Sequence, residues 1–244
     1  MSLVAPRRKP ELEQIITQTL PCRSELHWRY DSSVTQLFYA SRIMQAIETD
    51  SRGSTHSSLL RRAAMHDGRA WQELVDLYGP LISKWCRRTG ADWNMTADCI
   101  QEVFLVLAKR LDTFRPTGAS GAFRTWLWSI TKNKLIDLFR ASNRQPLATG
   151  GSTAHLALQA VATEQDWLRD EPTEPIDISS LTRRAIEQVR SEFTAQSWTV
   201  FERTVVDGIE TSIVSRELGL SPSAIRQAKS RILRRLRQQM GDLD

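Results

Sequence analysis

The spacing of apolar residues is the feature of this sequence that most restricts its fold. Apolar residues recur at intervals of three and four along most of the chain, as on one face of an α-helix, and no run of valine or isoleucine is bounded like a β-strand. We therefore expect an all-α protein, with a kink or a break in one helix at Gly79-Pro80. Helices are expected over residues 57–66, 68–88, 94–111, 121–140, 179–192, 195–206, 211–218 and 221–239.

Charge divides the chain into two basic parts and an acidic connector. Lys and Arg outnumber Asp and Glu by 20 to 14 in residues 1–140 and by 11 to 8 in residues 178–244, whereas residues 141–177 hold 2 basic and 6 acidic side chains. The connector is rich in Pro, Gly, Ser and Thr, which is typical of a flexible linker. We expect two small helical domains joined by this linker. The expected boundaries are a mobile N-terminal extension at 1–56, a first domain at 57–140, a linker at 141–178 and a second domain at 179–244.

Composition excludes several classes of protein. The 244 residues are 41% hydrophobic and 25% charged, which is typical of a globular protein. No run of 18 apolar residues predicts a membrane span, and the first residues lack the apolar core of a secretory signal, so we expect a cytoplasmic protein with no membrane partner. Cys22, Cys86 and Cys99 lie far apart without metal-ligand spacing, so we expect reduced thiols, no metal and no cofactor. Met44 is an alternative candidate for the first residue.

The helix expected at residues 221–239 is amphipathic and strongly basic. At about 100° per residue, one of its stripes is apolar and the opposite arc is basic. The apolar stripe consists of Ile225, Ala228, Ile232, Leu236 and Met240, and the opposite arc of Arg226, Gln227, Ser230, Arg231, Arg234 and Arg237. A shorter helix with Val214 and Leu218 facing inward precedes it, followed by a turn at Gly219 and by Ser221 as N-cap. This order is typical of a helix-turn-helix.

The helix-turn-helix pattern favours binding in the major groove of DNA. Ser223, Arg226, Gln227 and Ser230 lie in the N-terminal half of the helix, where side chains reach base edges. Arg pairs with guanine and Gln with adenine through two hydrogen bonds each, whereas Arg231 and Arg234 are better placed for phosphates. A charged face at a chain end is often only solvated, but the turn and the cap together favour DNA.

The helix expected at residues 94–111 has an acidic face. Asp98, Gln101, Glu102 and Leu105 lie opposite its apolar stripe. A leucine among carboxylates and an amide suits docking on a basic protein surface, while the carboxylates would repel DNA. The alternative is a face that meets only solvent.

The helix expected at residues 121–140 combines aromatic and basic side chains. We expect Phe123, Trp126, Leu127 and Ile130 to pack in a core, and Trp128, Lys132 and Phe139 to point away from it. Rings beside cations suit unstacked bases, which stack on aromatic faces while Lys and Arg bind phosphates. Asn133 supplies an amide that can read a base edge. The alternative is that every ring belongs to the core.

Three segments together resemble a known family. The stretch TADCIQEVFLVLAKRLDTFRP followed by FRTWLWSITKNKLIDLFR resembles region two of the sigma-70 family, and the C-terminal helix-turn-helix resembles region four. The resemblance covers about residues 57–140 and 178–240. With only these two regions and a linker, the chain resembles an extracytoplasmic-function sigma factor, a non-catalytic subunit of RNA polymerase.

The resemblance implies a role for each candidate site. In this family the helix that carries Asp98, Gln101, Glu102 and Leu105 docks on core RNA polymerase, with Phe104 packed beneath that face. The minus-ten promoter element would be melted and held by Phe114, Arg124, Trp128, Lys132, Asn133 and Lys134. The minus-thirty-five element would be read by Ser223, Arg226, Gln227, Ser230, Arg231 and Arg234. The implied partners are core polymerase, promoter DNA and, commonly in the family, an anti-sigma factor.

Two other functions stay open at this point. A helix-turn-helix activator or repressor acting on duplex DNA would account for the last helix but does not need the acidic face. An enzyme such as a DNA recombinase needs a nucleophilic Ser or Tyr among arginines, or a carboxylate metal cluster, and the sequence shows neither. The chain also departs from the family: the loop between Phe114 and Phe123 is longer than usual, and residues 1–56 have no counterpart.

Overall fold

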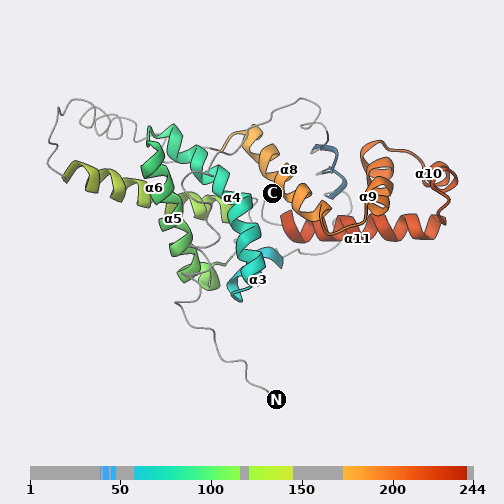
Figure 1. Ribbon diagram of the computed structural model, residues 1–244, viewed down its shortest axis with the longest axis horizontal. Coiled ribbons are helices and arrows are strands. Elements are labelled where there is room, and N and C mark those ends of the chain that lie inside the picture. Colours follow the sequence, from blue (N-terminus) through green and yellow to red (C-terminus); the bar gives the residue numbers. More distant parts are fainter. Residues whose placement is uncertain are drawn as a thin grey trace, which may run out of the picture. The chain divides into compact units, whose positions relative to one another are not determined.

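The computed structural model describes residues 39, 41–43, 45–47, 58–115, 121–144 and 173–240 (Figure 1). These residues are mostly helical and include no β-strand, so the prediction of an all-α fold is confirmed. They form two compact units, with one boundary inside helix α3 (Ser58–Ala64), between Arg61 and Arg62, and another between Glu174 and Pro175. Within the described part of the chain, no helix is long and apolar enough to cross a membrane.

The first unit is built on helices α4 (Gly68–Arg88), α5 (Trp93–Arg110) and α6 (Ala122–Arg144), with the 3-10 turn η1 (Leu111–Thr113) after α5. Helix α5 packs against both α4 and α6. Helix α4 begins where the Asp67 carboxylate accepts hydrogen bonds from the backbone N–H groups of Arg69 and Ala70, at 2.9 and 3.2 Å. Asp92 caps α5 in the same way, 2.8 Å from the Met95 nitrogen. Such caps satisfy N–H groups that have no partner within the helix.

Helix α4 continues through Gly79-Pro80, so of the two predicted outcomes, a kink or a break, the break does not occur. Pro80 has no N–H, and one backbone hydrogen bond of the helix is therefore missing at this point. Both residues are buried, and α4 packs against α5 and α6. Packing against two neighbours holds the helix together across the missing bond.

The core of the first unit is aromatic. Trp71, Tyr78, Trp85, Phe104 and Phe123 are each at most 2% exposed. The rings of Tyr78 and Phe123 meet edge to face, with centroids 5.0 Å apart. Because burial of one such side chain stabilises a fold by about 1.5–3 kcal/mol, apolar packing is the main force that joins these three helices.

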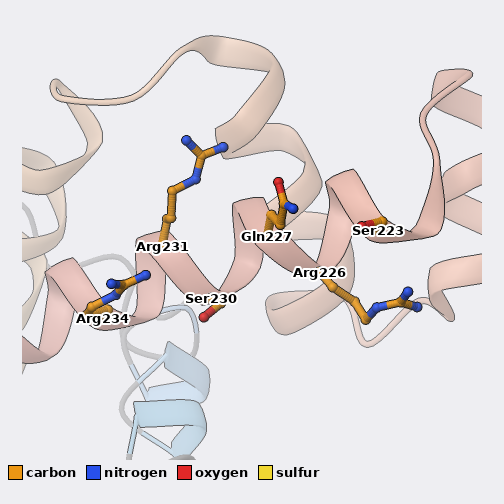
Figure 2. A pocket seen from close by; sticks show the side chains of 6 residues that line it. All are labelled: Ser223, Arg226, Gln227, Ser230, Arg231 and Arg234. Atoms are coloured by element: carbon orange, nitrogen blue, oxygen red, sulfur yellow. The ribbon is translucent and has the colours of Figure 1, made fainter.

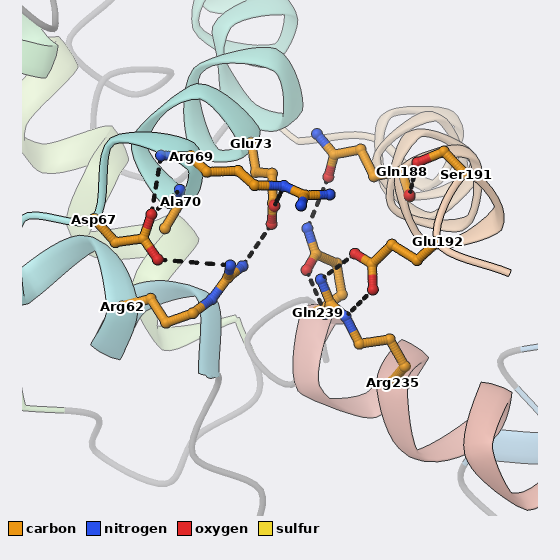
Figure 3. Close-up of polar contacts among 10 residues, drawn as sticks. All are labelled: Arg62, Asp67, Arg69, Ala70, Glu73, Gln188, Ser191, Glu192, Arg235 and Gln239. Carbon is orange, nitrogen blue, oxygen red and sulfur yellow. Dashed lines mark hydrogen bonds and ion pairs between the residues drawn. The ribbon is translucent and has the colours of Figure 1, made fainter.

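A cluster of ion pairs joins α3 to the start of α4 (Figure 3). Arg62 Nη2 lies 2.6 Å from Glu73 Oε2, and Arg69 Nε lies 3.3 Å from Glu73 Oε1. Glu73 is only 9% exposed. An unpaired carboxylate would be costly to bury there, so the two guanidinium groups are needed to hold it.

The second unit contains α8 (Pro175–Arg190), α9 (Ala195–Phe201), the π-helical turn η2 (Glu202–Val206), α10 (Thr211–Leu218) and α11 (Pro222–Met240). Helix α11 packs against α8, α9 and α10. Residues 195–206, predicted as one helix, are α-helical only to Phe201 and then widen, with the Asp207 N–H donating to the Glu202 carbonyl at 3.0 Å. This five-residue spacing defines a π-helix.

Polar side chains fix the C-terminal half of α11 beside the end of α8 (Figure 3). Arg235 donates to both carboxylate oxygens of Glu192, at 2.8 and 2.7 Å. Gln239 Nε2 donates to Gln188 Oε1 at 2.8 Å. The two-pronged contact of a guanidinium with a carboxylate sets direction as well as distance, so it orients α11 on α8.

Part of the expected N-terminal extension is packed in the second unit. Residues 39, 41–43 and 45–47 are helical, with Ile43 0% and Ile47 5% exposed. These two isoleucines are therefore packed rather than solvated, and the expected mobility of the extension stays a prediction. The other residues of 1–56, and residues 145–172 of the predicted linker, lie outside the described part of the chain. The predicted domain boundaries stay predictions.

Candidate functional site

Helix α11 presents an exposed polar and basic face. Six side chains line an open depression of about 470 Å³ along the helix (Figure 2). They are Ser223, Arg226, Gln227, Ser230, Arg231 and Arg234. Each of the six is exposed, as the sequence predicts. Figure 2 shows Gln227 and Arg231 extending to one side of the helix and Arg226 to the other.

The opposite stripe of α11 is buried in a small apolar core. Ile225, Ala228, Ile232, Leu236 and Met240 are all buried, which confirms the predicted stripe. Ile225 and Ala228 pack with Val200 of α9 and Val214 of α10, and Ile209, Leu218 and Leu220 cover this cluster. Burial of this stripe forces the basic arc outward.

The turn between α10 and α11 has the predicted chemistry. Gly219 has φ 64° and ψ 26°, the left-handed conformation in which a side chain is strained. Ser221 Oγ accepts from the backbone N–H of Ala224 at 3.2 Å, which caps α11. The pair of helices is therefore a helix-turn-helix with its second helix exposed.

The sequence predicts Arg237 as a member of the exposed arc, but the structure places it outside that arc. Its side chain is half-buried, and burial lowers the pKa of the guanidinium. Sequence spacing placed it with the other arginines, but α8 packs beside this end of α11, where Gln188 contacts Gln239. Arg237 is thus a poor candidate for a phosphate contact.

The acidic face predicted on α5 is present. Asp98 and Gln101 are exposed, and Glu102 and Leu105 are half-buried beside them. Phe104 is 0% exposed and packs beneath this face, as expected. Lys134 of α6 reaches across to Glu102, with Nζ 2.9 Å from Oε2. Lys134 therefore contributes to the acidic face, which makes it a weaker candidate for a DNA contact than the sequence suggested.

Trp128 is buried, so the prediction that it points away from the core is wrong. It is 3% exposed, and its ring meets Trp85 edge to face at 5.4 Å. Thr131, one turn along the helix, is also 0% exposed, and its hydroxyl is satisfied by donating to the Leu127 carbonyl at 2.9 Å. A threonine reads as polar in the sequence, and this hid how far the buried arc of α6 extends toward Trp128.

Trp126 lies at the edge of the core instead. It is half-buried, and its ring stacks on Phe114 with centroids 4.8 Å apart and an angle of 27° between planes. Phe123, beneath the pair, is fully buried. The sequence predicted that Trp126 packs in the core. Its place on the helical wheel, at one edge of the arc of buried residues, could have indicated that it is only partly covered. Phe114 and Trp126 together form an aromatic rim.

The polar candidates on α6 are distributed around the helix. Asn133 is exposed, and it follows Trp126 by seven residues, which at about 100° per residue returns it to nearly the same face. Lys132 and Arg124 are half-buried. The Arg124 guanidinium lies over Gly121, where a Cβ would come within 2.5 Å of it. The aromatic rim and Asn133 therefore share a face, whereas Lys132 lies to one side of it. Loop residues 116–120 lie outside the described residues.

Neither of the two cysteines among the described residues is placed for chemistry. Cys86 and Cys99 are fully buried, and their mutual hydrogen bond, followed by burial, raises the pKa of the Cys86 thiol. A protonated, inaccessible thiol is unreactive. Among the described residues, no group of three His, Cys, Asp or Glu side chains could hold a metal ion.

Comparison with known proteins identifies relatives of this chain. Residues 74–145 match the family described as Sigma-70 region 2. The chain is 28% identical over 193 residues to the ECF RNA polymerase sigma factor ShbA of Streptomyces griseus, covering 77% of this chain and 96% of that protein. It is 23% identical to the ECF RNA polymerase sigma factor SigD of Mycobacterium tuberculosis, covering 78% and 85%. It is also 27% identical to the RNA polymerase sigma factor CnrH of Cupriavidus metallidurans, covering 68% and 84%.

The described residues combine an all-helical fold, an exposed basic face on a helix-turn-helix and a separate acidic face. The matched region and these relatives support an extracytoplasmic-function sigma factor of the sigma-70 family.

Substitution of the two tryptophans of α6 separates their roles. We expect Trp128→Ala to lower the free energy of unfolding by about 3–5 kcal/mol, because it opens a cavity in the core. Trp126→Ala should cost less than half as much, since its ring is already partly in contact with water. Urea unfolding of both variants, followed by tryptophan fluorescence and by far-UV circular dichroism, measures the difference. Equal losses would contradict the assignment of Trp126 to the rim.

Proposed function

We propose that this chain, as a sigma factor, directs core RNA polymerase to promoters and opens them, while the polymerase supplies all nucleotidyl chemistry. In this proposal residues 57–140 act as region two, residues 141–178 as the linker and residues 179–244 as region four. The protein is not itself an enzyme, and it acts in the cytoplasm with core polymerase and promoter DNA. An anti-sigma factor is a further candidate partner, since such regulation is common in the family.

The observation that carries this proposal is an exposed acidic face on the same chain as a basic helix-turn-helix. Asp98 and Gln101 are exposed on α5, while Arg226 and Arg231 are exposed on α11. A repressor that acts only on duplex DNA needs the second of these faces and gains nothing from the first. Complementary charge speeds and selects protein association, so the acidic face supports docking on a basic surface of core polymerase.

Helix α11 is proposed to read the minus-thirty-five element. Its N-terminal residues Ser223, Arg226, Gln227 and Ser230 would meet base edges in the major groove. Arg231 and Arg234 would bind phosphates, which position the helix without reading sequence. The exposure of all six side chains supports this division of roles.

The aromatic rim is proposed to hold bases of the melted minus-ten element. Phe114 and Trp126 offer ring surface at the edge of the core, and Asn133 on the same face supplies an amide for a base edge. Stacking of one base on such a ring contributes roughly 1–3 kcal/mol, which is comparable to the cost of unstacking one step. Arg124 and Lys132 are proposed as flanking phosphate contacts. The buried Trp128 is left out of the direct contacts.

A run-off transcription assay tests the proposed function. Purified core polymerase should initiate on a genomic fragment library only when the full chain is added, and the transcripts should share upstream elements. A helix-turn-helix activator or repressor would change initiation only when another sigma factor is present. Binding of duplex DNA by the chain alone, with no dependence of initiation on it, would contradict the proposal in favour of that alternative.

Charge reversal on α5 tests the polymerase-binding face. We expect Asp98→Arg to weaken binding to core polymerase by roughly tenfold, or about 1.4 kcal/mol, because a carboxylate facing a basic surface becomes a repelled cation. Fluorescence anisotropy of the labelled chain titrated with core enzyme measures the affinity. Asp207→Arg is the matched control, since this exposed carboxylate lies in the other unit and undergoes the same change in charge. An equal loss of affinity in both variants would indicate a general charge effect rather than a docking face.

Two substitutions on α6 test the proposed melting site. Trp126→Ala and Asn133→Ala should each reduce permanganate reactivity of promoter thymines by roughly fivefold or more, because a stacked ring or an amide contact to a melted base is lost. Affinity for core polymerase should stay within twofold of the unchanged chain. Thr125→Ala, which alters an exposed residue elsewhere on the helix, serves as the control. Unchanged permanganate footprints in both test variants would contradict the assignment of this face to melted DNA.

A further inference from the structure

The short helix that contains Tyr39, Ile43 and Ile47 is part of the second unit. More than 100 residues of sequence separate this helix from α8, the first long helix of that unit. Tyr39, Ile43 and Ile47 follow one another at intervals of four and so share one face of this helix. Ile43 is 0% and Ile47 5% exposed, whereas Ser41 and Gln45 on the opposite face are exposed. The helix therefore has one face committed to packing.

Two polar contacts show what that face packs against. The Tyr39 hydroxyl donates to Glu202 Oε1 at 2.8 Å, and the same oxygen accepts from Trp198 Nε1 at 3.0 Å. Arg42 Nε donates to the Val206 carbonyl at 3.3 Å. Glu202 and Val206 are the first and last residues of the π-helical turn η2. The N-terminal helix thus contacts both ends of this turn.

These contacts satisfy groups that η2 cannot satisfy by itself. The carbonyl at the end of a helix has no partner within the helix, and Arg42 provides one for Val206. Next to it, Gly208 has φ 70°, and a Cβ there would lie 3.5 Å from Arg42 Nη2, so the arginine fits closely over a left-handed glycine. Burial, followed by the hydrogen bond to Glu202, raises the pKa of Tyr39, so its hydroxyl keeps the proton that it donates.

The π-helical segment η2 also contacts the helix-turn-helix. It contacts both α9 and α10. Arg203 of η2 forms an ion pair with Glu217 of α10, and the Ile209 N–H donates to the Arg203 carbonyl at 2.9 Å. A shift of η2 would therefore move α10, which packs on α11 through Val214.

We propose that α9 and η2 form a docking surface for an amphipathic helix with the pattern Tyr-x-x-Arg-Ile-x-x-x-Ile, and that residues 39–47 of the same chain are its occupant. The occupied surface fixes η2 and, through it, the orientation of the helix-turn-helix. A chain that starts at Met44 would lack Tyr39, Arg42 and Ile43 and would leave the surface empty. The segment is thus a working part of the unit that carries α11, and not a dispensable extension.

Hydrogen–deuterium exchange tests this inference on the full chain and on a chain that begins at Met44. Amides of residues 198–218 should exchange at least tenfold faster in the shortened chain, because η2 loses its contacts. A synthetic peptide of residues 34–50, added in excess, should restore most of the protection, and the same peptide with Ile43→Asp should not. Equal exchange in both chains would overturn the proposal, as would restoration by the Ile43→Asp peptide.

A milder variant keeps the test decisive if the shortened chain fails to fold. In the full chain, Tyr39→Phe removes only the hydroxyl that donates to Glu202, and we expect exchange in residues 198–206 to rise by roughly threefold. Ser41→Ala, on the exposed face, should leave exchange unchanged. Identical exchange in Tyr39→Phe and Ser41→Ala would refute the anchoring role of Tyr39. Exchange reports on this contact whether or not the chain is active in transcription, so failure here is distinguishable from failure of the proposed function.

Discussion

Burial of one apolar stripe per helix is the constraint on which the rest of this structure depends. A helix that packs along one side must present its other side to solvent or to a partner. In α11, burial of Ile225, Ile232 and Leu236 leaves the arginines outside. In α5, burial of Phe104 and Leu107 leaves Asp98 and Gln101 outside. The two faces differ in charge but arise from the same packing rule.

The separation of opposite charges onto different units has a physical consequence. A basic face attracts phosphates over a distance of about 8–10 Å at moderate ionic strength, and carboxylates on the same face would cancel that field. Here the exposed carboxylate of α5 and the arginines of α11 belong to different units, so neither face mixes the two signs through these residues. The pairing of Glu102 with Lys134 also shows that the acidic face is not purely negative. The acidic face of α5 therefore carries both signs of charge at defined positions. Such an arrangement favours a specific protein partner over general attraction to cations.

The helix-turn-helix is supported from outside its own sequence. Short helices such as α10 have too few residues to be stable alone, and most of their stability comes from tertiary packing. Part of that support is the core of Val200, Val214 and Ile225. Another part comes through η2, which receives hydrogen bonds from Tyr39 and Arg42. Helix α11 is thus supported both by its own neighbours and by residues near the start of the chain.

The sequence by itself determined those features that depend only on local spacing and backbone chemistry. Apolar periodicity was enough to predict the helices and the buried stripe of α11, and Gly219 and Ser221 were enough to place its turn and cap, because a left-handed glycine and an N-cap hydroxyl act within a few residues. Only the tertiary structure decided which tryptophan of α6 is buried, since that depends on Trp85 across the core and on a threonine whose hydroxyl is satisfied within its own helix. It also decided that Arg237 is partly covered, that Lys134 pairs with Glu102 and that residues 39–47 pack on η2. Each of these outcomes depends on a neighbour that is distant in sequence, and periodicity along one helix carries no information about what the facing element supplies.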